Sequence, residues 1–412
     1  MRGEPSGTAR SIRFLTHSPP APGISGDRIR VFHLMRELKR RGWTVRLWSL
    51  VPPDEPGGFA GQLGAVTDEA VLVPRGISGP HRVARLSIDT VMGRAFHEHW
   101  FWSPATARAA SAWLADASTE PIFVEQLYMY PFVPAHVRGL VVLDTQNHEA
   151  ARIRAIARSE GGTGRRSIAR LQARAVERYE RKALRSVGRI LAVSPEEADA
   201  FAQMAPGRVS IVPNGVDTAA ISPLSAPPVS RDLLFVGSLA YSANRDAVSH
   251  FATDIAPRLA NSSARLTVVG SNPSAEVLAV AGRASLPITV TGYVPEIAPY
   301  FRTSRAMVVP LRHGGGTRLK ILEALAWGLP VVTTTIGGAG LGLVNGTHAL
   351  IADEPVDFAK AVEDLLHDDA LWARLSNAGR ALVEARYSWS HIGDALETAV
   401  TDIGASTGSF EP

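Results

Sequence analysis

The stretch VVPLRHGGGTRLKILEALAWGLPVVTT, residues Val308 to Thr334, decides how the rest of the chain is interpreted. A short apolar run over Val308–Leu311 predicts a buried strand, and a glycine triplet follows it. Thr317 can cap the next segment, whose apolar residues have helical spacing. That helix ends at Gly328 and Pro330, before a second buried strand. Strand, glycine loop, helix and strand in this order predict part of a parallel α/β sheet.

The glycine loop and the first helical turn have the composition of a nucleotide site. Gly315 and Gly316 let backbone N–H groups approach a ligand closely, and a helix N-terminus favours phosphate. Arg318 and Lys320 add positive charge, and Glu323, one turn later, is placed to accept hydrogen bonds from ribose hydroxyls. A solvated helix start would also carry such charges. We favour the nucleotide site because the segment lies between two buried strands.

Composition sets the class of protein. A chain of 412 residues with 45% hydrophobic and 20% charged residues predicts a soluble globular protein with two domains. The absence of cysteine excludes disulfides, thiolate catalysis and cysteine metal sites, and it fits a reducing compartment. The N-terminus lacks the apolar core of a secretory signal, and no apolar run approaches the ~20 residues of a spanning helix. We therefore expect a cytoplasmic protein.

Much of the formal net charge of +4 is local. Residues 152–189 contain twelve Arg or Lys and three Glu, within a segment of helical character. Such a helix can lie on anionic lipid headgroups, which would place the protein peripherally at the inner face of the cell membrane. A solvated charged face is the other interpretation. No nucleic-acid recognition motif accompanies the charge, so no nucleic-acid partner is expected.

The N-terminal part opens with the same alternation. Residues 11–16 predict a strand, the proline- and glycine-rich loop HSPPAPGISGD follows, and a helix begins near Asp27, a natural cap. The loop lacks the G-x-G-x-x-G fingerprint, which disfavours a nicotinamide dehydrogenase. Further along, the strand in GLVVLDTQNHEA ends in polar residues that include Asp144 and His148. Ligands bind at such carboxyl ends of strands in open α/β sheets.

A linker over Ser222–Asp232, rich in proline and serine, marks a domain boundary. We predict an acceptor-side domain over 1–222 and a nucleotide-sugar-binding domain over 223–387, with a helix over 388–412 that packs back on the first. Each half predicts a doubly wound parallel sheet. The expected fold class is α/β, with two Rossmann-like domains that face each other across a cleft.

Several segments resemble glycosyltransferase family 4, whose members are retaining enzymes of the two-domain GT-B fold. The resemblance is carried in order by VSIVPNGVD, LLFVGSL, VTGYVPEI and GGGTRLKILEALAWGLPVVTT. PAPGISGDRIRVFHLMREL and VLDTQNHEA are similar to segments of bacterial exopolysaccharide-associated sugar transferases. The resemblance covers nearly the whole chain and is specific for fold and superfamily rather than substrate.

The resemblance implies a hexosyltransferase-type enzyme of polysaccharide biosynthesis that moves a sugar from a nucleotide-diphosphate donor with retention. It implies no cofactor and no essential metal. The family's ribose-binding glutamate corresponds to Glu323, and its backbone phosphate contacts correspond to Gly237, Ser238 and the Gly316–Thr317 turn. The implied acceptor is a glycan, a lipid-linked compound or a small molecule.

Two departures from the family pattern affect the donor site. Gly315 stands where the family often has an earlier glutamate that contacts the donor sugar. The family's arginine and lysine after the first strand of the nucleotide domain are replaced by Ser238 and by Ala243 or Asn244. We hypothesise that Lys320, aided by the neighbouring arginine, neutralises the leaving diphosphate instead.

The first domain is expected to bind the acceptor. Gly23 and Gly26 would let an acceptor or the leaving phosphate approach the backbone, and Arg30 lies one turn into the following helix. Many relatives place a histidine after the strand that reads IFVEQL here, but this chain has Glu125 at that place. His148 is the alternative candidate beside Glu125 for a catalytic role, with Lys320 in the other domain. Two other functions remain open: a nucleotide-sugar 2-epimerase and a non-catalytic nucleotide-binding scaffold.

Overall fold

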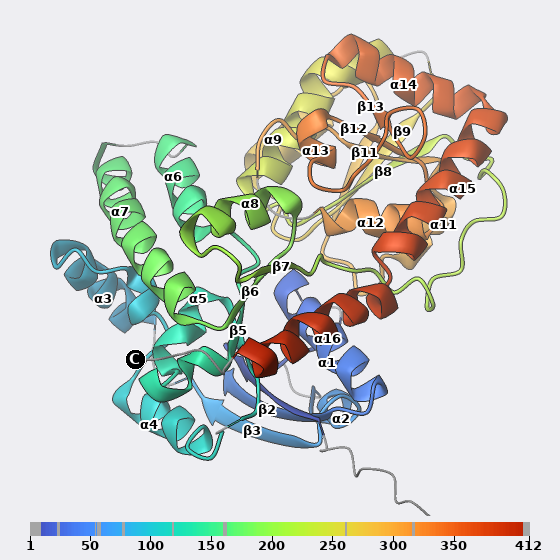
Figure 1. Cartoon of the computed structure of the whole chain (residues 1–412). Helices are drawn as coiled ribbons and strands as arrows, with labels where there is room; N and C mark the ends of the chain where they lie inside the picture. Colours follow the sequence, from blue (N-terminus) through green and yellow to red (C-terminus); the bar gives the residue numbers. More distant parts are fainter. Residues whose placement is uncertain are drawn as a thin grey trace, which may run out of the picture. The chain divides into compact units, whose positions relative to one another are not determined.

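The computed structural model describes residues 10–22, 25–53, 55, 59–75, 79–117, 119–159, 163–259, 262–314 and 318–406. The chain divides into two compact units, which are drawn in Figure 1. Unit 1 comprises residues 1–213 and 392–412, and unit 2 comprises residues 214–391. The sequence places the boundary at residue 222, whereas the two units of the structure meet between residues 213 and 214.

A parallel sheet forms the centre of unit 1. Its strand order is β3-β2-β1-β4-β5-β6-β7, so the order reverses between β1 and β4. Every neighbouring pair is parallel. The strands are β1 (Ser11–Thr16), β2 (Thr44–Val51), β3 (Glu69–Pro74), β4 (Ile122–Glu125), β5 (Val141–Asp144), β6 (Arg189–Ala192) and β7 (Val209–Ile211). In an open parallel sheet, the reversal point is where ligands bind.

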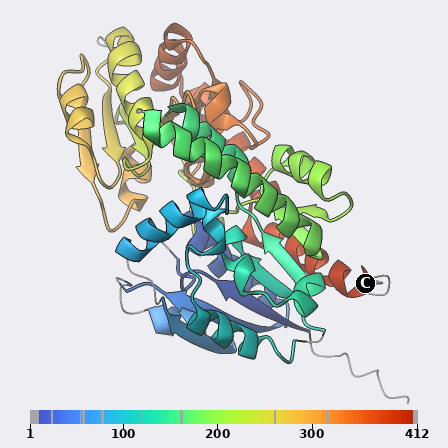
Figure 2. The same cartoon turned by 90° about the vertical axis from the view of Figure 1, so that its left-hand side faces the viewer.

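Helices flank both faces of this sheet (Figure 1). They are α1 (Gly26–Arg40), α2 (Phe59–Gly64), α3 (Gly79–Val91), α4 (Pro104–Trp113), α5 (Gln126–Met129), α6 (Glu149–Ser159), α7 (Thr163–Ser186), α8 (Pro195–Met204) and α16 (Trp389–Ser406). The basic segment of the sequence forms two of them, α6 and α7, which lie side by side in Figures 1 and 2.

The core of unit 1 explains why its strands are short apolar runs. The sheet is covered on both faces, so a central strand such as β5 is buried at every residue. At the reversal point Phe14 of β1 stacks on Phe123 of β4, with ring centroids 4.6 Å apart. These two rings pack on one face of the two strands whose carboxyl ends carry the polar residues discussed below.

Unit 2 contains a second parallel sheet, with strand order β10-β9-β8-β11-β12-β13. Its order reverses between β8 and β11. The strands are β8 (Asp232–Val236), β9 (Arg265–Val269), β10 (Ile288–Gly292), β11 (Ala306–Val309), β12 (Val331–Thr333) and β13 (Leu350–Ile351). The helices are α9 (Ser242–His250), α10 (Ala275–Gly282), α11 (Ala298–Thr303), α12 (Leu319–Ala326), α13 (Thr335–Gly338), α14 (Pro355–His367) and α15 (Asp369–Arg386). Two doubly wound parallel sheets confirm the predicted α/β class.

The stretch that opened the sequence analysis forms β11, a loop, α12 and β12, in the predicted order. Helix α12 buries Ile321, Leu322 and Leu325, which pack in the core of unit 2. It ends at Ala326, and Gly328 adopts the left-handed backbone conformation (φ +68°) that terminates many helices. The burial of this face fixes which way the first turn of α12 presents its charged residues.

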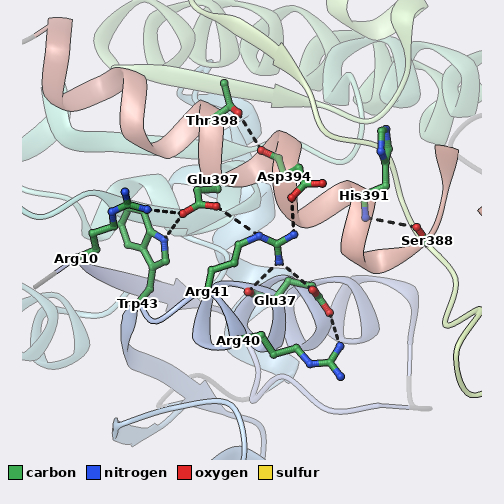
Figure 3. Close-up of polar contacts among 10 residues, drawn as sticks. All are labelled: Arg10, Glu37, Arg40, Arg41, Trp43, Ser388, His391, Asp394, Glu397 and Thr398. Atoms are coloured by element: carbon green, nitrogen blue, oxygen red, sulfur yellow. Dashed lines mark hydrogen bonds and ion pairs between the residues drawn. The ribbon is translucent and has the colours of Figure 1, made fainter. Parts of the chain in front are cut away.

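Helix α16 returns to unit 1, to which it belongs from Ile392 onward (Figure 3). Arg41, just after α1, binds Asp394 at 2.7 Å and Glu397 at 3.4 Å. The Trp43 indole N–H donates to Glu397 at 3.0 Å. These contacts attach the end of the chain to the α1–β2 connection.

Within the part of the chain that the structure describes, no helix has the length and apolar character needed to cross a membrane.

Candidate functional site

In unit 2, a lysine and an asparagine join the loop after β8 to the start of α12. The Lys320 ammonium donates to Asn244 Oδ1 at 2.8 Å and lies 4.2 Å from the ring centroid of Phe235. The amide nitrogen of Asn244 donates to the carbonyl oxygen of Ser238, also at 2.8 Å. Both the oxygen and the nitrogen of the Asn244 side-chain amide are thus hydrogen-bonded. It positions Lys320 beside the reversal point of the sheet.

Gly237 leaves the space that this lysine occupies. A Cβ at Gly237 would lie 2.6 Å from Lys320 Nζ and 2.7 Å from Asn244 Nδ2. Any other residue would therefore displace the ammonium from the loop. The neighbouring Ser238 is exposed, and its hydroxyl accepts a hydrogen bond from Ser271 at 3.2 Å. The structure brings together four of the predicted donor-site residues, which are Gly237, Ser238, Asn244 and Lys320.

Lys320 is held in conditions that disfavour its charge. Burial lowers the pKa of Lys320 to about 7, and repulsion from Arg318 acts in the same direction. Arg318 immediately precedes α12 and is buried, which lowers the pKa of its guanidinium. A Cβ at Gly314 would lie 3.4 Å from both Arg318 Nη2 and the Tyr241 hydroxyl, so the arginine borders the glycine loop. Two adjacent cations at the start of a helix suit an incoming phosphate.

Glu323 lies one turn after Lys320 on the same helix. Burial raises the pKa of Glu323 to about 7. The described residues offer its carboxylate no hydrogen bond and no ion pair. A partly buried carboxylate without donors is costly unless a ligand supplies them. Ribose hydroxyls are donors of the required kind, which agrees with the role predicted for Glu323.

The remaining donor-site predictions lie outside the described residues. They concern Gly315, Gly316 and Thr317, so the turn between β11 and α12 stays a prediction. The described part of α12 begins with Arg318 at the N-cap position, without a side-chain capping bond.

In unit 1, three ionisable side chains meet where the strand order reverses. His17 follows β1, Glu125 ends β4, and Asp27 lies in the first turn of α1. The His17 ring Nδ1 lies 2.8 Å from Glu125 Oε2, and the His17 backbone N–H donates to the same oxygen at 3.0 Å. Its Nε2 lies 3.3 Å from Asp27 Oδ2. The imidazole is therefore held between two carboxylates.

The imidazolium of His17 and the carboxylate of Asp27 stabilise each other's charge. Burial lowers the pKa of His17, but the charges and hydrogen bonds of Glu125 and Asp27 outweigh it and raise the pKa to about 9. Burial also raises the pKa of Asp27, yet the contact with His17 prevails and lowers it to about 2. Burial raises the pKa of Glu125 above its ordinary value despite the same imidazolium. His17 is consequently protonated at neutral pH, with Asp27 ionised.

The atoms of this trio are close enough for a cation to be considered, since one ligand atom from each lies within 4.8 Å of the others. The ring contacts argue against it. Glu125 lies at Nδ1 and Asp27 at Nε2, so an ion could bind the imidazole only if it displaced one of these carboxylate contacts.

Sequence reasoning named Glu125 and missed His17. It also placed Asp27 as the cap of α1, which is wrong because Ser25 occupies the N-cap position. The Asp27 carboxylate instead contacts His17 from inside the first turn. The criterion that singled out Glu125, a polar residue at the carboxyl end of a strand, applies equally to His17.

His148 lies elsewhere in unit 1, immediately before α6. Its Nε2 is 3.4 Å from Glu180 Oε2, and its ring meets Phe201 edge-on at 5.7 Å. Burial, followed by the Arg154 charge, lowers the pKa of His148. The Glu180 carboxylate accepts hydrogen bonds from the backbone N–H groups of Glu149 and Ala150 at the start of α6. These contacts give His148 a place at a helix terminus, not beside Glu125.

The prediction that Arg30 contacts an acceptor or phosphate is wrong. Its guanidinium is buried and makes three contacts with Asp144, the last residue of β5, with Nη2 2.7 Å from Oδ1. It also donates to the carbonyl oxygens of Val212 and Pro213 at 2.8 and 2.7 Å. A side chain so occupied fixes α1 to the ends of β5 and β7. Gly26 is the first residue of α1, and Gly23 lies outside the described residues.

Both halves of the chain match known families. Residues 24–220 match the family described as Glycosyltransferase Family 4, and residues 230–368 match the family described as Glycosyl transferases group 1. A D-inositol 3-phosphate glycosyltransferase of Rhodococcus opacus is 27% identical over 242 residues, 53% of this chain and 54% of that protein. A glycogen synthase of Mycobacterium tuberculosis is 29% identical over 219 residues, 50% of each chain. The chain spans about half the length of the curated relatives it matches.

Solved structures share the fold over nearly the whole chain. A sucrose-phosphate synthase from Thermosynechococcus elongatus superposes with a TM-score of 0.69 at 18% identity, over 96% of this chain and 100% of that one. HepE from Anabaena, solved in complex with UDP and glucose, gives a TM-score of 0.64 at 14% identity, over 95% and 100%. At these identities the likeness establishes the fold alone.

Proposed function

Because the chain belongs to glycosyltransferase family 4, matched over residues 24–220, and carries a glycosyl transferases group 1 domain over residues 230–368, we propose that it is a retaining glycosyltransferase. The family assignment agrees with the resemblance seen in the sequence. The proposed reaction moves a sugar from a nucleotide-diphosphate donor to an acceptor hydroxyl, as a hexosyltransferase does. Unit 2 binds the donor and unit 1 binds the acceptor.

One arrangement carries the proposal: Lys320, held by Asn244 in the space left by Gly237, with the carboxylate of Glu323 one turn along α12. The ammonium pairs with the diphosphate, and the carboxylate accepts hydrogen bonds from the ribose. Two solved structures of the same fold contain UDP, HepE with glucose and TarM with an α-GlcNAc-glycerol. The UDP bound in these two structures supports a nucleotide-sugar donor for this chain.

The chemistry asks the protein to stabilise a departing diphosphate. Negative charge develops on the phosphate oxygens as the bond to the sugar breaks. Lys320 and Arg318 supply positive charge from the first turn of α12, and a phosphate beside Lys320 restores the protonation that burial opposes. This supports a reaction without an essential metal or other cofactor.

The proposed acceptor is a glycan, a lipid-linked compound or a small molecule. Relatives are named for transfer to D-inositol 3-phosphate and for the synthesis of glycogen, so sugars and polyols are the first acceptors to try. A role in polysaccharide biosynthesis fits such acceptors.

The surface of α7 supports a peripheral contact with an anionic membrane. One open surface hollow is lined by five cations and one acid from this helix, namely Arg174, Glu177, Arg178, Arg181, Lys182 and Arg185. Earlier along the helix Ile168 and Leu171 are exposed, and α3, which packs beside α7, exposes Ile88 and Val91. Exposed apolar side chains next to a cationic stripe are typical of surfaces that lie in the headgroup region.

The donor site is tested by titrating the purified protein with UDP, GDP, dTDP and ADP and with their sugar conjugates. Base-selective binding that weakens at least tenfold in Glu323→Ala supports the site, while Glu363→Gln on α14 is the matched carboxylate control. Failure of every nucleotide to bind would contradict the proposal. Product analysis without acceptor separates a transferase from a 2-epimerase, which converts its donor alone.

The membrane contact is tested by sedimentation with vesicles of phosphatidylglycerol and phosphatidylcholine. Replacing Arg174 and Lys182 by glutamine should reduce binding, because each cation near an anionic surface contributes about 1 kcal/mol. Arg108→Gln on α4 is the control. Equal sedimentation with vesicles of pure phosphatidylcholine would remove the electrostatic interpretation.

A further inference from the structure

The trio of His17, Asp27 and Glu125 lies in unit 1, outside the donor site proposed in unit 2. We propose that this trio receives the acceptor hydroxyl: Asp27 accepts its hydrogen bond, and His17, fixed by Glu125, holds Asp27 in position. The inference rests on the proposed function and deepens it, because it assigns the acceptor side of the reaction to three particular residues, of which the sequence pattern had singled out only Glu125 as a catalytic candidate.

Position is the first argument. His17 and Glu125 stand at the carboxyl ends of β1 and β4, the two strands between which the sheet order reverses. Asp27 comes from the helix that follows β1. The crevice outside such a reversal point is the usual ligand site of an open parallel sheet. Unit 2 has its Lys320 and Gly237 at the equivalent point, beside β8 and β11.

The trio runs from the interior to the surface. The side chain of Glu125 is 1% exposed, that of His17 is 15% exposed and that of Asp27 is 24% exposed. The buried carboxylate binds both the ring Nδ1 and the backbone N–H of His17, which leaves the imidazole little freedom to rotate. The outermost member, Asp27, is the one that a solute can reach.

A purely structural role explains this arrangement poorly. Burying charges costs free energy, and apolar residues of similar size often replace a buried ion pair without loss of stability. The nearby pair of Arg30 and Asp144 is structural, since its arginine also binds two backbone carbonyl groups and so ties three elements together. In the trio, by contrast, the only partner that the described residues offer Glu125 is His17. Clusters of mutually perturbed titratable groups at a crevice are commonest at functional sites.

The charges indicate what the site takes. Asp27 is an acceptor of hydrogen bonds at neutral pH, and both ring nitrogens of His17 carry protons directed at carboxylates. Two carboxylates repel an anion, and a metal ion would have to displace a ring proton. A hydroxyl group fits, because it can donate to Asp27 without a change of charge.

In the reaction, the acceptor oxygen forms a bond to the anomeric carbon of the donor sugar. The bond between that carbon and the phosphate oxygen breaks, and its electron pair leaves with the diphosphate. As the new bond forms, the hydroxyl hydrogen turns from Asp27 to the departing phosphate oxygen and the proton passes to that oxygen, so Asp27 remains ionised and His17 remains protonated. Asp27 is the binding residue, and His17 and Glu125 are positioning residues.

The experiment compares Asp27→Asn, His17→Gln and a matched control, His99→Gln. His99 is also a histidine of unit 1 with a carboxylate partner, Asp89 at 3.0 Å, and its side chain is 18% exposed. Each protein is given the nucleotide sugar that binds best. UDP, or the corresponding nucleotide, is then measured with water, D-inositol 3-phosphate or maltooligosaccharides as acceptor. Nucleotide affinity is measured separately by calorimetry.

We expect Asp27→Asn and His17→Gln to lower nucleotide release at least tenfold while nucleotide affinity stays within twofold of wild type. His99→Gln should match wild type in both. The wild-type rate should also decline as pH rises through about 9, where His17 loses its proton, and His17→Gln should lack that decline. The charged groups that face His17 are Glu125, Asp27 and Arg75, whose guanidinium donates to the His17 carbonyl oxygen.

Three results would overturn the inference. The first is normal turnover in Asp27→Asn, which is exposed enough to keep the fold. The second is a wild-type protein that binds the nucleotide but releases none from its sugar conjugate with any acceptor. The third is one-to-one binding of Mn²⁺ that disappears in Asp27→Asn, which would make the trio a cation site. Loss of nucleotide binding in wild type would instead contradict the proposed function of unit 2.

Discussion

Nucleotide binding should exchange protons with the solvent, because Lys320 and Glu323 both have a pKa of about 7 in the protein by itself. A diphosphate beside Lys320 favours the ammonium and raises its pKa toward the ordinary 10.5. Ribose hydroxyls that donate to Glu323 favour the carboxylate and lower its pKa toward the ordinary 4.5. The two halves of a nucleotide therefore act on the proton balance in opposite directions.

The expected magnitudes follow from the two pKa values. At pH 7 a group with a pKa of about 7 is half protonated, so complete pairing of Lys320 takes up about 0.5 proton. Complete ionisation of Glu323 releases about 0.5 proton. For the lysine, the rise from about 7 to 10.5 corresponds to at most ~5 kcal/mol of preference of the phosphate for the charged form. A nucleoside diphosphate should show a small net exchange, as the sum of two opposing terms.

The assay is isothermal titration calorimetry at pH 7 in buffers of different ionisation enthalpy. Pyrophosphate reports the lysine alone, and the nucleoside without phosphate reports the carboxylate alone. Lys320→Met should shift the proton number of the diphosphate by about −0.5, and Glu323→Gln by about +0.5, counted as protons taken up.

The reasoning is refuted if wild type and both variants exchange the same number of protons with the diphosphate. Such a result would mean that neither group changes its protonation when the ligand binds. A shift of the same sign in both variants would also contradict it, since the ammonium and the carboxylate would then not face opposite ends of the nucleotide.

Three further outcomes test the fold around the sites. Glu323→Gln should stabilise unit 2 at pH 8 by up to ~3 kcal/mol and leave its stability unchanged below pH 4.5. The reason is that the raised pKa of Glu323 makes the folded unit lose stability as pH rises from 4.5 through about 7. Thermal unfolding across pH checks this, and a gain in stability at pH 4 would contradict it. Arg30→Met should lower the free energy of unfolding of unit 1, measured in urea, by about 3–5 kcal/mol, because Asp144 stays buried without its partner. The double variant with Asp144→Leu should recover most of this loss. If it recovers none, the arginine stabilises the fold through its contacts with the backbone carbonyl groups instead. Arg41→Ala should speed hydrogen exchange in α16 after residue 392 by roughly fivefold to thirtyfold, as expected for a loss of ~1–2 kcal/mol. Unchanged exchange would show that the contacts of Figure 3 do not attach α16 to unit 1.

Local patterns predicted the sheets of both units because each strand is a short apolar run between a loop and a helix with its own start and stop signals. The stretch around α12 is the clearest case, where Gly328 ends the helix and the apolar side of the helix fixes its orientation. Lys320 and Glu323 could be assigned roles from the sequence because they share one helical turn with that buried face. Asn244 was harder to interpret, since its function depends on a lysine 76 residues away.

The residues of unit 1 were less predictable for the same reason. His17, Asp27 and Glu125 are joined only by the pairing of β1 with β4, and 108 residues separate the histidine from the glutamate. No local spacing rule connects them. Asp27 has the residue type of a helix cap. Only the structure, with Ser25 at the N-cap position, shows that the Asp27 carboxylate contacts His17 instead.

Arg30 and His17 show why a place at the active edge of a sheet does not identify a functional residue. Both are polar, both lie near strand ends of the same sheet, and both contact a carboxylate. The difference lies in what each side chain contacts besides that carboxylate. Arg30 turns its remaining donors to backbone carbonyl groups, whereas the chain from Glu125 through His17 ends at the partly exposed carboxylate of Asp27. We infer that a buried charged side chain whose other partners are backbone carbonyl groups stabilises the fold. A buried charged side chain whose other partner is an accessible carboxylate positions that carboxylate for a ligand.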